Sequence, residues 1–339
     1  GMKNYWVAVG VMAGFCQGGG VGKCIAEWII DGEPSIDVWA MDVARFGDYA
    51  SPQYGTIKSS ENYERRFIMT FPNETLPKGR KQKTTTLYDR FVNQGAVMGD
   101  SFGLENVLWF ANNKEDAHEE PTIKRSRSHD YVSKEVINVR ENVGLIEVAN
   151  FSKHEFKGPD ARKFLDHIMA GRLPKPGRIS LSPMLSYRGK LCGDLTVACL
   201  DENEFMVFGS GAAQEMHRRW FESHLDKFNL SYSNRSDEYH GLSIAGPNSR
   251  KVLEKIVRDD VSNEKFKFRD SRRMFVGGVP AIINRISFTG ELGYEIYVAP
   301  HYQLKLYEEL MEAGKEFNIK PFGGRALMSM RLEKNWGAW

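Results

Sequence analysis

The chain has 339 residues, enough for two or three domains with substantial cores. Apolar residues make up 41% and charged residues 27% of it, which is ordinary for a globular protein, and the net charge of +2 favours neither a nucleic-acid nor a membrane partner. No run of about 18 apolar residues suggests a membrane span, and no secretory signal precedes the first predicted strand.

The four cysteines show no C-x-x-C spacing, and the histidines form no H-E-x-x-H pattern. We therefore expect no disulfide framework and no metal site. Cysteine usage of this kind fits a reducing compartment: the cytoplasm or, in a eukaryote, the mitochondrial matrix.

The N-terminal stretch predicts a buried strand over 5–11, then a glycine-rich turn within GGGVGK at 18–23, then a helix that stops at 31–34. Gln17 stands where a phosphate-binding loop has its first glycine, and Lys23 stands where a dinucleotide fingerprint has its last. Neither motif is present. A helix N-terminus behind the glycines could still face an anion, or the glycines could permit a close helix–strand crossing.

Residues 51–87 are mostly polar and are predicted to be a linker, with a compact domain starting near Tyr88. Apolar residues recur at helical spacing over 161–169, strands are predicted at 189–200 and 204–210, and a helix at about 212–225.

From His240 the order becomes strand, helix, hairpin, strand, helix, which is close to a ferredoxin-like arrangement and indicates an α+β second lobe. The predicted elements are a strand at 240–246, a helix at 248–257, a hairpin turning at 276–280, a strand at 293–299 and a helix at 302–317. An amphipathic helix is predicted within 326–339.

Two acids stand out because each enters an apolar strand, where an ionised side chain needs a partner or water: Asp194 and Glu295. His217 and His224 are seven residues apart on a predicted helix, about 10 Å along its axis, which is too far to share a metal ion. We expect each to be a surface or capping residue. These patterns alone predict a two-lobed α+β protein with a polar pocket and no named reaction.

Five stretches, in order, closely resemble the folate-binding part of the dimethylglycine and sarcosine dehydrogenases, which is related to the aminomethyltransferase T-protein of the glycine cleavage system. They are 84–110, 142–169, 193–200, 287–298 and 324–339. The resemblance implies an α+β, aminomethyltransferase-like folate-binding fold with a ferredoxin-like second lobe. The third, β-rich lobe of that family would be missing, since the chain stops soon after the fifth stretch.

The resemblance also implies a domain order. Residues 1–50 resemble the last segment of an FAD-dependent oxidoreductase domain, whose glycine turn would approach the flavin; 51–87 is the linker. Residues 88–235 would form the folate-binding first lobe and 236–339 the truncated second lobe. FAD would be held only in a full-length parent enzyme, with its FAD domain as a possible partner.

Four site residues follow from the same resemblance. Asp194 matches an aspartate beside the reactive amine of tetrahydrofolate, where it could act as a base or orient the amine. Glu295 matches a glutamate that pairs with donors on the pterin ring. Phe288 stands where the T-protein has a tyrosine, and Arg325 matches an arginine near the far end of the folate.

The implied function is tetrahydrofolate-dependent one-carbon transfer, which forms 5,10-methylenetetrahydrofolate from the oxidation product of a small N-methyl amine. Two alternatives stay open. One is a non-catalytic folate-binding or regulatory module, and the other is a full flavin-dependent amine oxidoreductase, against which the missing fingerprint argues.

Overall fold

The structure is a computed structural model, and it describes residues 4–337. Its contacts divide the chain into two compact units, Gly1–Gly47 and Asp48–Trp339. Among the described residues, no helix combines the length and apolar character needed to cross a bilayer.

The first unit consists of helix α1 (Gly14–Asp31) and two short 3₁₀ turns, η1 (Trp39–Met41) and η2 (Val43–Arg45). The predicted strand over 5–11 is wrong: this backbone is irregular and largely exposed. No strand among residues 4–337 pairs with it, and an unpaired strand leaves its backbone groups without partners.

The predicted glycine turn is also wrong, because Gly18–Gly20 lie inside α1. Val21, Ile25 and Trp28 recur at helical spacing, and this pattern continues the helix through glycines that each disfavour it by about 1 kcal/mol. The predicted end is confirmed, since Gly32 follows Asp31 in a left-handed C-cap conformation.

The second unit begins with a helix inside the segment expected to be a linker. Helix α2 (Pro52–Glu64) has proline in its first turn and Ser51 as N-cap, whose hydroxyl accepts the Tyr54 amide at 3.2 Å. Glu61 of α2 is buried and accepts the Lys78 amide at 2.7 Å. The segment is therefore folded onto itself before the first strand.

A β-hairpin and two helices follow. Strands β1 (Ala96–Ser101) and β2 (Leu104–Phe110) pair antiparallel, with helix α3 (Tyr88–Asn93) before them and helix α4 (Ser128–Glu141) after them.

The larger sheet has six strands in the order β10-β11-β12-β9-β3-β13. The predicted ferredoxin-like order is confirmed. Its strands are β3 (Gly144–Glu147), β9 (His240–Ala245), β10 (Ser271–Val276), β11 (Val279–Asn284), β12 (Gly293–Val298) and β13 (Lys320–Pro321). Its outer face packs in one apolar core with helices α7 (Ser249–Ile256) and α8 (Pro300–Ala313). Strand β3, from earlier in the chain, joins this sheet by pairing with β9.

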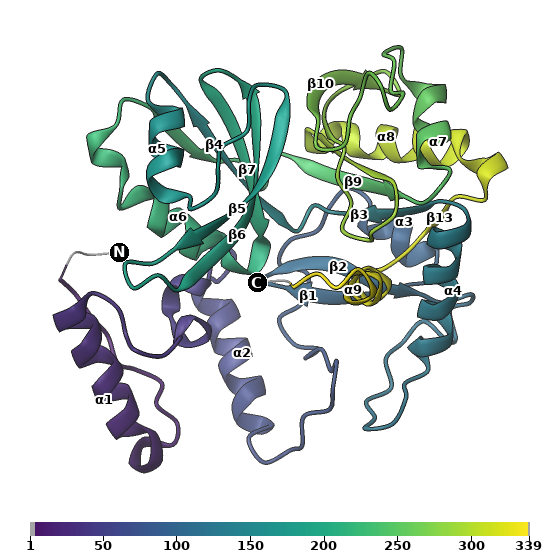
Figure 1. Cartoon of the computed structure of the whole chain (residues 1–339). Coiled ribbons are helices and arrows are strands. Elements are labelled where there is room, and N and C mark those ends of the chain that lie inside the picture. Colours follow the sequence, from purple (N-terminus) through teal and green to yellow (C-terminus); the bar gives the residue numbers. More distant parts are fainter. Residues whose placement is uncertain (1–3, 338–339) are drawn as a thin grey trace. The chain divides into compact units, whose positions relative to one another are not determined.

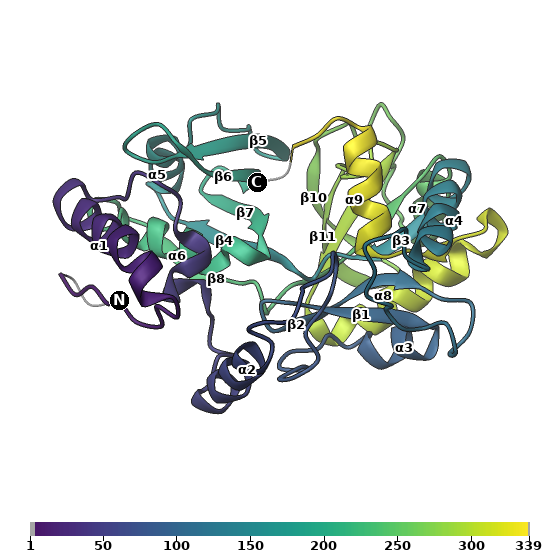
Figure 2. The ribbon, with the colours of Figure 1, turned by 90° about the horizontal axis from the view of Figure 1, so that it is seen from below.

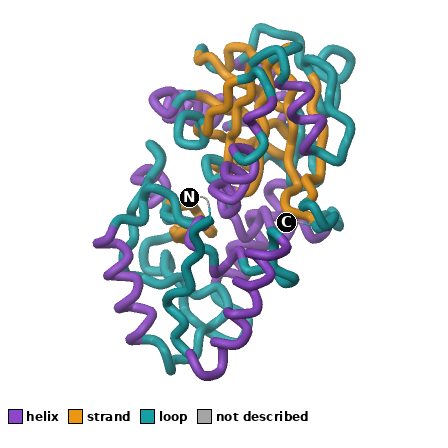
Figure 3. Tube along the Cα trace, turned by 90° about the vertical axis from the view of Figure 1, so that its left-hand side faces the viewer, coloured by secondary structure: helices purple, strands orange, loops and turns teal. Residues whose placement is uncertain are grey.

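The second sheet has five strands in the order β5-β6-β7-β4-β8. They are β4 (Phe151–Lys157), β5 (Arg178–Leu185), β6 (Leu191–Asp201), β7 (Glu204–Ser210) and β8 (Ser231–Asn234). One face packs against helices α5 (Ala161–Ile168) and α6 (Gln214–Glu222), as the ribbon in Figure 1 illustrates. The predicted helices and strands of this region are confirmed, and Figure 3 colours the helices, strands and loops along the chain.

The remaining faces of the two sheets share a core. Ala198 and Phe208 of the five-stranded sheet belong to the same apolar cluster as Ile282 and Tyr297 of the six-stranded sheet. The rings of Phe208 and Tyr297 stack with centroids 4.5 Å apart. Helix α9 (Gly324–Glu333) also contributes to this cluster, and Figure 2 shows it close to α4. It ends before Trp336, and residues 338–339 of the predicted helix lie outside the described part.

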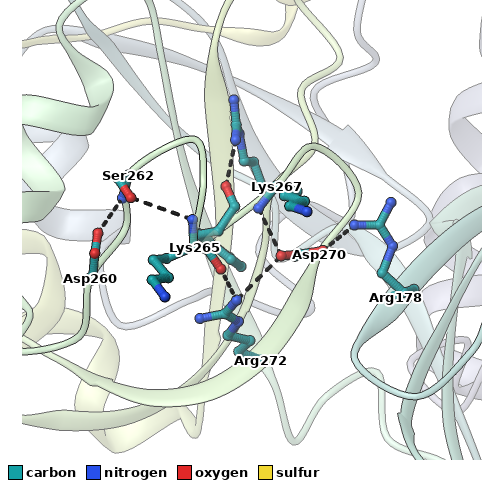
Figure 4. Close-up of polar contacts among 9 residues, drawn as sticks. Arg178, Asp260, Ser262, Lys265, Lys267, Asp270 and Arg272 are labelled. Carbon is teal, nitrogen blue, oxygen red and sulfur yellow. Dashed lines mark hydrogen bonds and ion pairs between the residues drawn. The ribbon is translucent and has the colours of Figure 1, made fainter.

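A loop also joins the sheets away from that core. The amide of Ile179 donates to the Arg269 carbonyl at 2.8 Å, and the amide of Ser271 donates to the Gly177 carbonyl at 2.9 Å. Figure 4 shows the side chains around this junction, where Asp270 accepts hydrogen bonds from Arg178 and from the Lys267 amide. The edge of β5 is thus tied to the start of β10.

Gly211, directly after β7, lies against the backbone at the start of β4. A Cβ added there would lie 1.9 Å from the Asn150 carbonyl oxygen, so the backbone would have to shift. We expect Gly211→Ala to lower the free energy of unfolding by roughly 1–3 kcal/mol in urea denaturation.

The matched control is Gly55→Ala in α2, where an added Cβ meets nothing within 4 Å. It should stabilise by up to about 1 kcal/mol. Equal effects of the two substitutions would contradict the packing described for Gly211.

Candidate functional site

Asp194 lies on the face of the five-stranded sheet that meets the other sheet. Thr196 and Lys153 both pair with Phe208, whose ring stacks on Tyr297 of the six-stranded sheet. Side chains two residues apart share a face, so Asp194 lies on this face next to Thr196 and Phe151 lies on it next to Lys153. Asp194 is on β6 and Phe151 is on β4, with β7 between them. At ordinary strand spacing, the backbones of β6 and β4 are about 10 Å apart.

Glu295 lies on the opposing face. It is two residues before Tyr297 on β12 and pairs directly with Asn284 on β11 and Ser243 on β9, which makes a polar row across the sheet. Only 7% of Glu295 is exposed. The sequence could not reveal this burial, because an acid at this point of a strand could equally lie in water.

The Glu295 carboxylate has one hydrogen bond within the described residues. The Tyr297 hydroxyl donates to Oε2 at 2.9 Å, and Oε1 receives no donor from residues 4–337. Burial raises the Glu295 pKa to about 7, against the opposing effects of the Tyr297 hydrogen bond and the ammonium charges of Lys153 and Lys334. At neutral pH the group is therefore poised between its acid and its carboxylate.

Asp194 is half-buried and makes no hydrogen bond to another residue between 4 and 337. Burial raises its pKa above the ordinary value for aspartate, with no neighbouring charge opposing it. A carboxylate in this state is a better base than an exposed one and has both oxygens available.

Phe288 lies in the loop between β11 and β12, the strand that carries Glu295. Its ring centroid is 6.4 Å from that of Phe151, the residue on the Asp194 face. The loop that carries it is held by Lys334, whose Nζ donates to the Ser287 carbonyl at 3.0 Å. Three of the four predicted residues, Asp194, Phe288 and Glu295, are therefore on the facing surfaces of the two sheets.

Arg325 is not brought to them. It lies in the first turn of α9, nine residues before Lys334, or about 13 Å along the helix axis. Its guanidinium pairs with Glu119 at 2.9 Å and donates to the Ser128 hydroxyl at 2.6 Å. It lines a separate pocket of 610 Å³ formed largely by 72–77 and 119–129.

Sequence reasoning missed a lysine beside Glu295. Lys153 is fully buried, and its Nζ donates to the carbonyls of Ala149 at 2.7 Å and Ser236 at 3.4 Å. Burial lowers its pKa to about 7, while Asp237, Glu147 and Glu295 oppose that change. No local signal marked this burial, because β4 is mostly polar and a lysine in it would be expected in water.

The histidine expectation is wrong for His217, which is buried. Its Nε2 lies 3.2 Å from the Cys192 carbonyl, and its ring lies 6.3 Å from that of buried His154. The helix face that carries it packs on the five-stranded sheet, and burial lowers the His217 pKa to about 4, so it is neutral. Among residues 4–337, no group of three or more metal-ligating side chains is placed to hold a metal ion.

The raised pKa of Glu295 predicts a pH-dependent effect on stability. The folded chain holds this proton up to about pH 7 whereas the unfolded chain releases it near 4.5, so the group lowers the free energy of unfolding as pH rises through that window. Glu295→Gln removes this loss. Relative to the parent chain, the variant should gain up to about 3 kcal/mol between pH 5 and pH 8 in urea denaturation.

Glu254→Gln is the control, because Glu254 is exposed on α7. It should follow the parent chain at both pH values. A Glu295→Gln curve parallel to the parent curve would contradict the proposed burial of the proton.

The chain matches two protein-family models. Residues 87–339 match the model described as the GCVT N-terminal domain, and residues 31–85 match that of the FAD dependent oxidoreductase central domain. The first match covers both sheets and all three clustered site residues.

Comparison with curated proteins agrees over the whole chain. It is 36% identical to human mitochondrial dimethylglycine dehydrogenase and 27% identical to human mitochondrial sarcosine dehydrogenase, with all of this chain covered in each case. It is also 29% identical to the mitochondrial pyruvate dehydrogenase phosphatase regulatory subunit of Mus musculus, again over all of this chain. The chain spans about two fifths of the length of these relatives, 39%, 42% and 40% respectively.

Among solved structures, the chain resembles the glycine cleavage system aminomethyltransferase T from Bartonella henselae. The TM-score is 0.63 at 22% identity, over 75% of this chain and 63% of that one. This likeness concerns the fold, and it confirms the expected aminomethyltransferase-like architecture.

Proposed function

The chain belongs to the GCVT N-terminal domain family, and we propose that it is the tetrahydrofolate-binding, one-carbon-transfer part of a dimethylglycine or sarcosine dehydrogenase-like enzyme. The observation that carries the proposal is the buried Glu295 carboxylate, which has an oxygen without a donor on the face opposite Asp194. An ionised carboxylate with so little exposure is costly unless a ligand or water completes its hydrogen bonds.

Reduced folate fits the residues present. A pterin ring has adjacent N–H donors, and the two oxygens of a charged Glu295 can accept them side by side. Phe288 and Phe151 supply aromatic surface beside the same place, although Phe288 has no hydroxyl to add a polar contact. Arg325 is occupied by Glu119, so its part in holding the far end of the folate would require that ion pair to open.

Asp194 is proposed to act on the reactive amine. When bound, tetrahydrofolate supplies the nitrogens that take up a carbon at the oxidation level of formaldehyde, giving 5,10-methylenetetrahydrofolate. Asp194, half-buried and without a hydrogen-bond partner among residues 4–337, would accept the amine proton and hold the amine in place. The carbon would come from a small N-methyl amine oxidised elsewhere in the parent enzyme.

FAD is proposed only for such a parent enzyme. The glycines expected to approach a flavin lie inside α1 and do not form a turn. The match of residues 31–85 to an FAD dependent oxidoreductase central domain supports an FAD domain as the partner that generates the one-carbon unit. The mitochondrial names of several relatives favour the matrix as its compartment, with the cytoplasm as the alternative.

A regulatory module is the second candidate. A relative named as a phosphatase regulatory subunit is similar over the whole chain. That function would keep a ligand at Glu295 and make no use of Asp194 as a base.

The direct test is a calorimetric titration of the purified chain with tetrahydrofolate under anaerobic, reducing conditions at pH 8, where Glu295 is largely charged. Loss of the charged acceptor in Glu295→Gln should weaken binding by about tenfold or more. Glu254→Gln should bind as the parent chain does. Equal affinities for all three folded proteins would contradict the role of Glu295.

Asp194→Asn separates the two candidates. It should retain tetrahydrofolate binding, because Asp194 is not proposed to hold the pterin. In the full-length parent enzyme it should slow carbon transfer. An unchanged transfer rate would contradict the role of Asp194, whereas folate binding with no transfer by the parent enzyme itself would favour the regulatory module.

A further inference from the structure

Lys153 places an amine at the junction of the two sheets, and its pKa of about 7 means that it carries a positive charge below that pH. The chain crosses from the six-stranded to the five-stranded sheet at 148–150 and returns at 235–239. The Lys153 Nζ donates to one carbonyl in each crossing, that of Ala149 at 2.7 Å and that of Ser236 at 3.4 Å. No part of the residue is exposed, so neither water nor salt screens its charge effectively.

This charge acts on the Glu295 side of the site. The Nζ lies 5.9 Å from the centroid of the Tyr297 ring, and the hydroxyl of the same ring donates to Glu295 at 2.9 Å. The Lys153 ammonium lowers the Glu295 pKa, and the Glu295 carboxylate reciprocally raises that of Lys153. The lysine, the tyrosine and the glutamate therefore form one coupled cluster.

Other charged groups act on the same pair. Lys334, from the end of α9, also lowers the Glu295 pKa, whereas the paired neighbours on β11 and β9, Asn284 and Ser243, are neutral. Besides Glu295, the Lys153 pKa is affected by Asp237, Glu147 and Lys83. Lys334 is an exposed residue and Lys153 is not, so the buried charge is screened less.

We propose that Lys153 is a positioning residue that keeps the Glu295 carboxylate charged and able to accept two N–H donors from its ligand. A charged carboxylate is acceptor-only, whereas a protonated one turns one oxygen into a donor and repels an incoming N–H group. The ligand part of this inference rests on the proposed function, and the charge part concerns the chain alone.

The charge part is tested without ligand. In ¹³C-carboxyl-labelled chain, the Glu295 resonance is the one that disappears in Glu295→Gln, and its midpoint is followed against pH. Lys153→Met should move this midpoint up by about one pH unit or more, because an opposite charge is lost. The control, Lys227→Met, replaces an exposed lysine and should leave it unchanged. An unmoved midpoint in folded Lys153→Met would overturn the proposal.

The ligand part uses tetrahydrofolate and the same variants across pH. For each pH unit by which Lys153→Met raises the Glu295 midpoint, its affinity for tetrahydrofolate should fall tenfold at pH values below the midpoints of both the parent chain and the variant. At higher pH the affinity should recover. A loss of affinity equal at every pH would indicate a merely structural role and overturn the positioning role. If no variant binds tetrahydrofolate, the proposed function fails while the carboxyl midpoint still decides the charge part.

A second measurement applies if Lys153→Met does not fold. The ¹⁵Nζ resonance of Lys153 is titrated in the parent chain and in Glu295→Gln. Removal of the Glu295 charge should lower the Lys153 midpoint, because that charge holds its pKa up. Identical midpoints would mean that the two groups are not coupled, and would overturn the proposal.

Discussion

The site depends on one energetically unfavourable feature, the burial of the Glu295 carboxylate between two sheets. Desolvation alone would keep this group protonated at neutral pH. The hydroxyl of Tyr297 and the ammonium groups of Lys153 and Lys334 oppose that effect and bring its pKa to about 7. At neutral pH the protonated and charged forms of Glu295 are thus similar in free energy, and a ligand with N–H donors would favour the charged form.

The surroundings of Glu295 depend on the two sheets keeping a fixed position against each other. The stacked rings of Phe208 and Tyr297 join their facing surfaces, and the backbone hydrogen bonds of Ile179 and Ser271 tie their edges. Lys153 contacts both chain crossings between the sheets. Asp194 and Glu295 come from opposite sheets, so the same contacts that stabilise the fold also set the two acids opposite each other.

Part of the second unit could be predicted from periodicity, since α5, β6, β7 and the ferredoxin-like order follow local apolar patterns. The N-terminal strand and the glycine turn could not, because both depended on a partner strand that residues 4–337 do not supply. Burial of Lys153 and His217 depended on packing between distant segments, which no local pattern encodes. The family resemblance predicted Asp194, Phe288, Glu295 and Arg325 as site residues. Only the structure shows that Arg325 lies apart from the other three.

If Glu295 holds the pterin ring of a reduced folate, a crystal structure of this chain with bound tetrahydrofolate will show the contact. We expect pterin N–H donors within hydrogen-bond distance of both Glu295 oxygens, with the reactive amine toward Asp194. A pterin ring bound elsewhere, for example in the pocket beside Arg325, would contradict it.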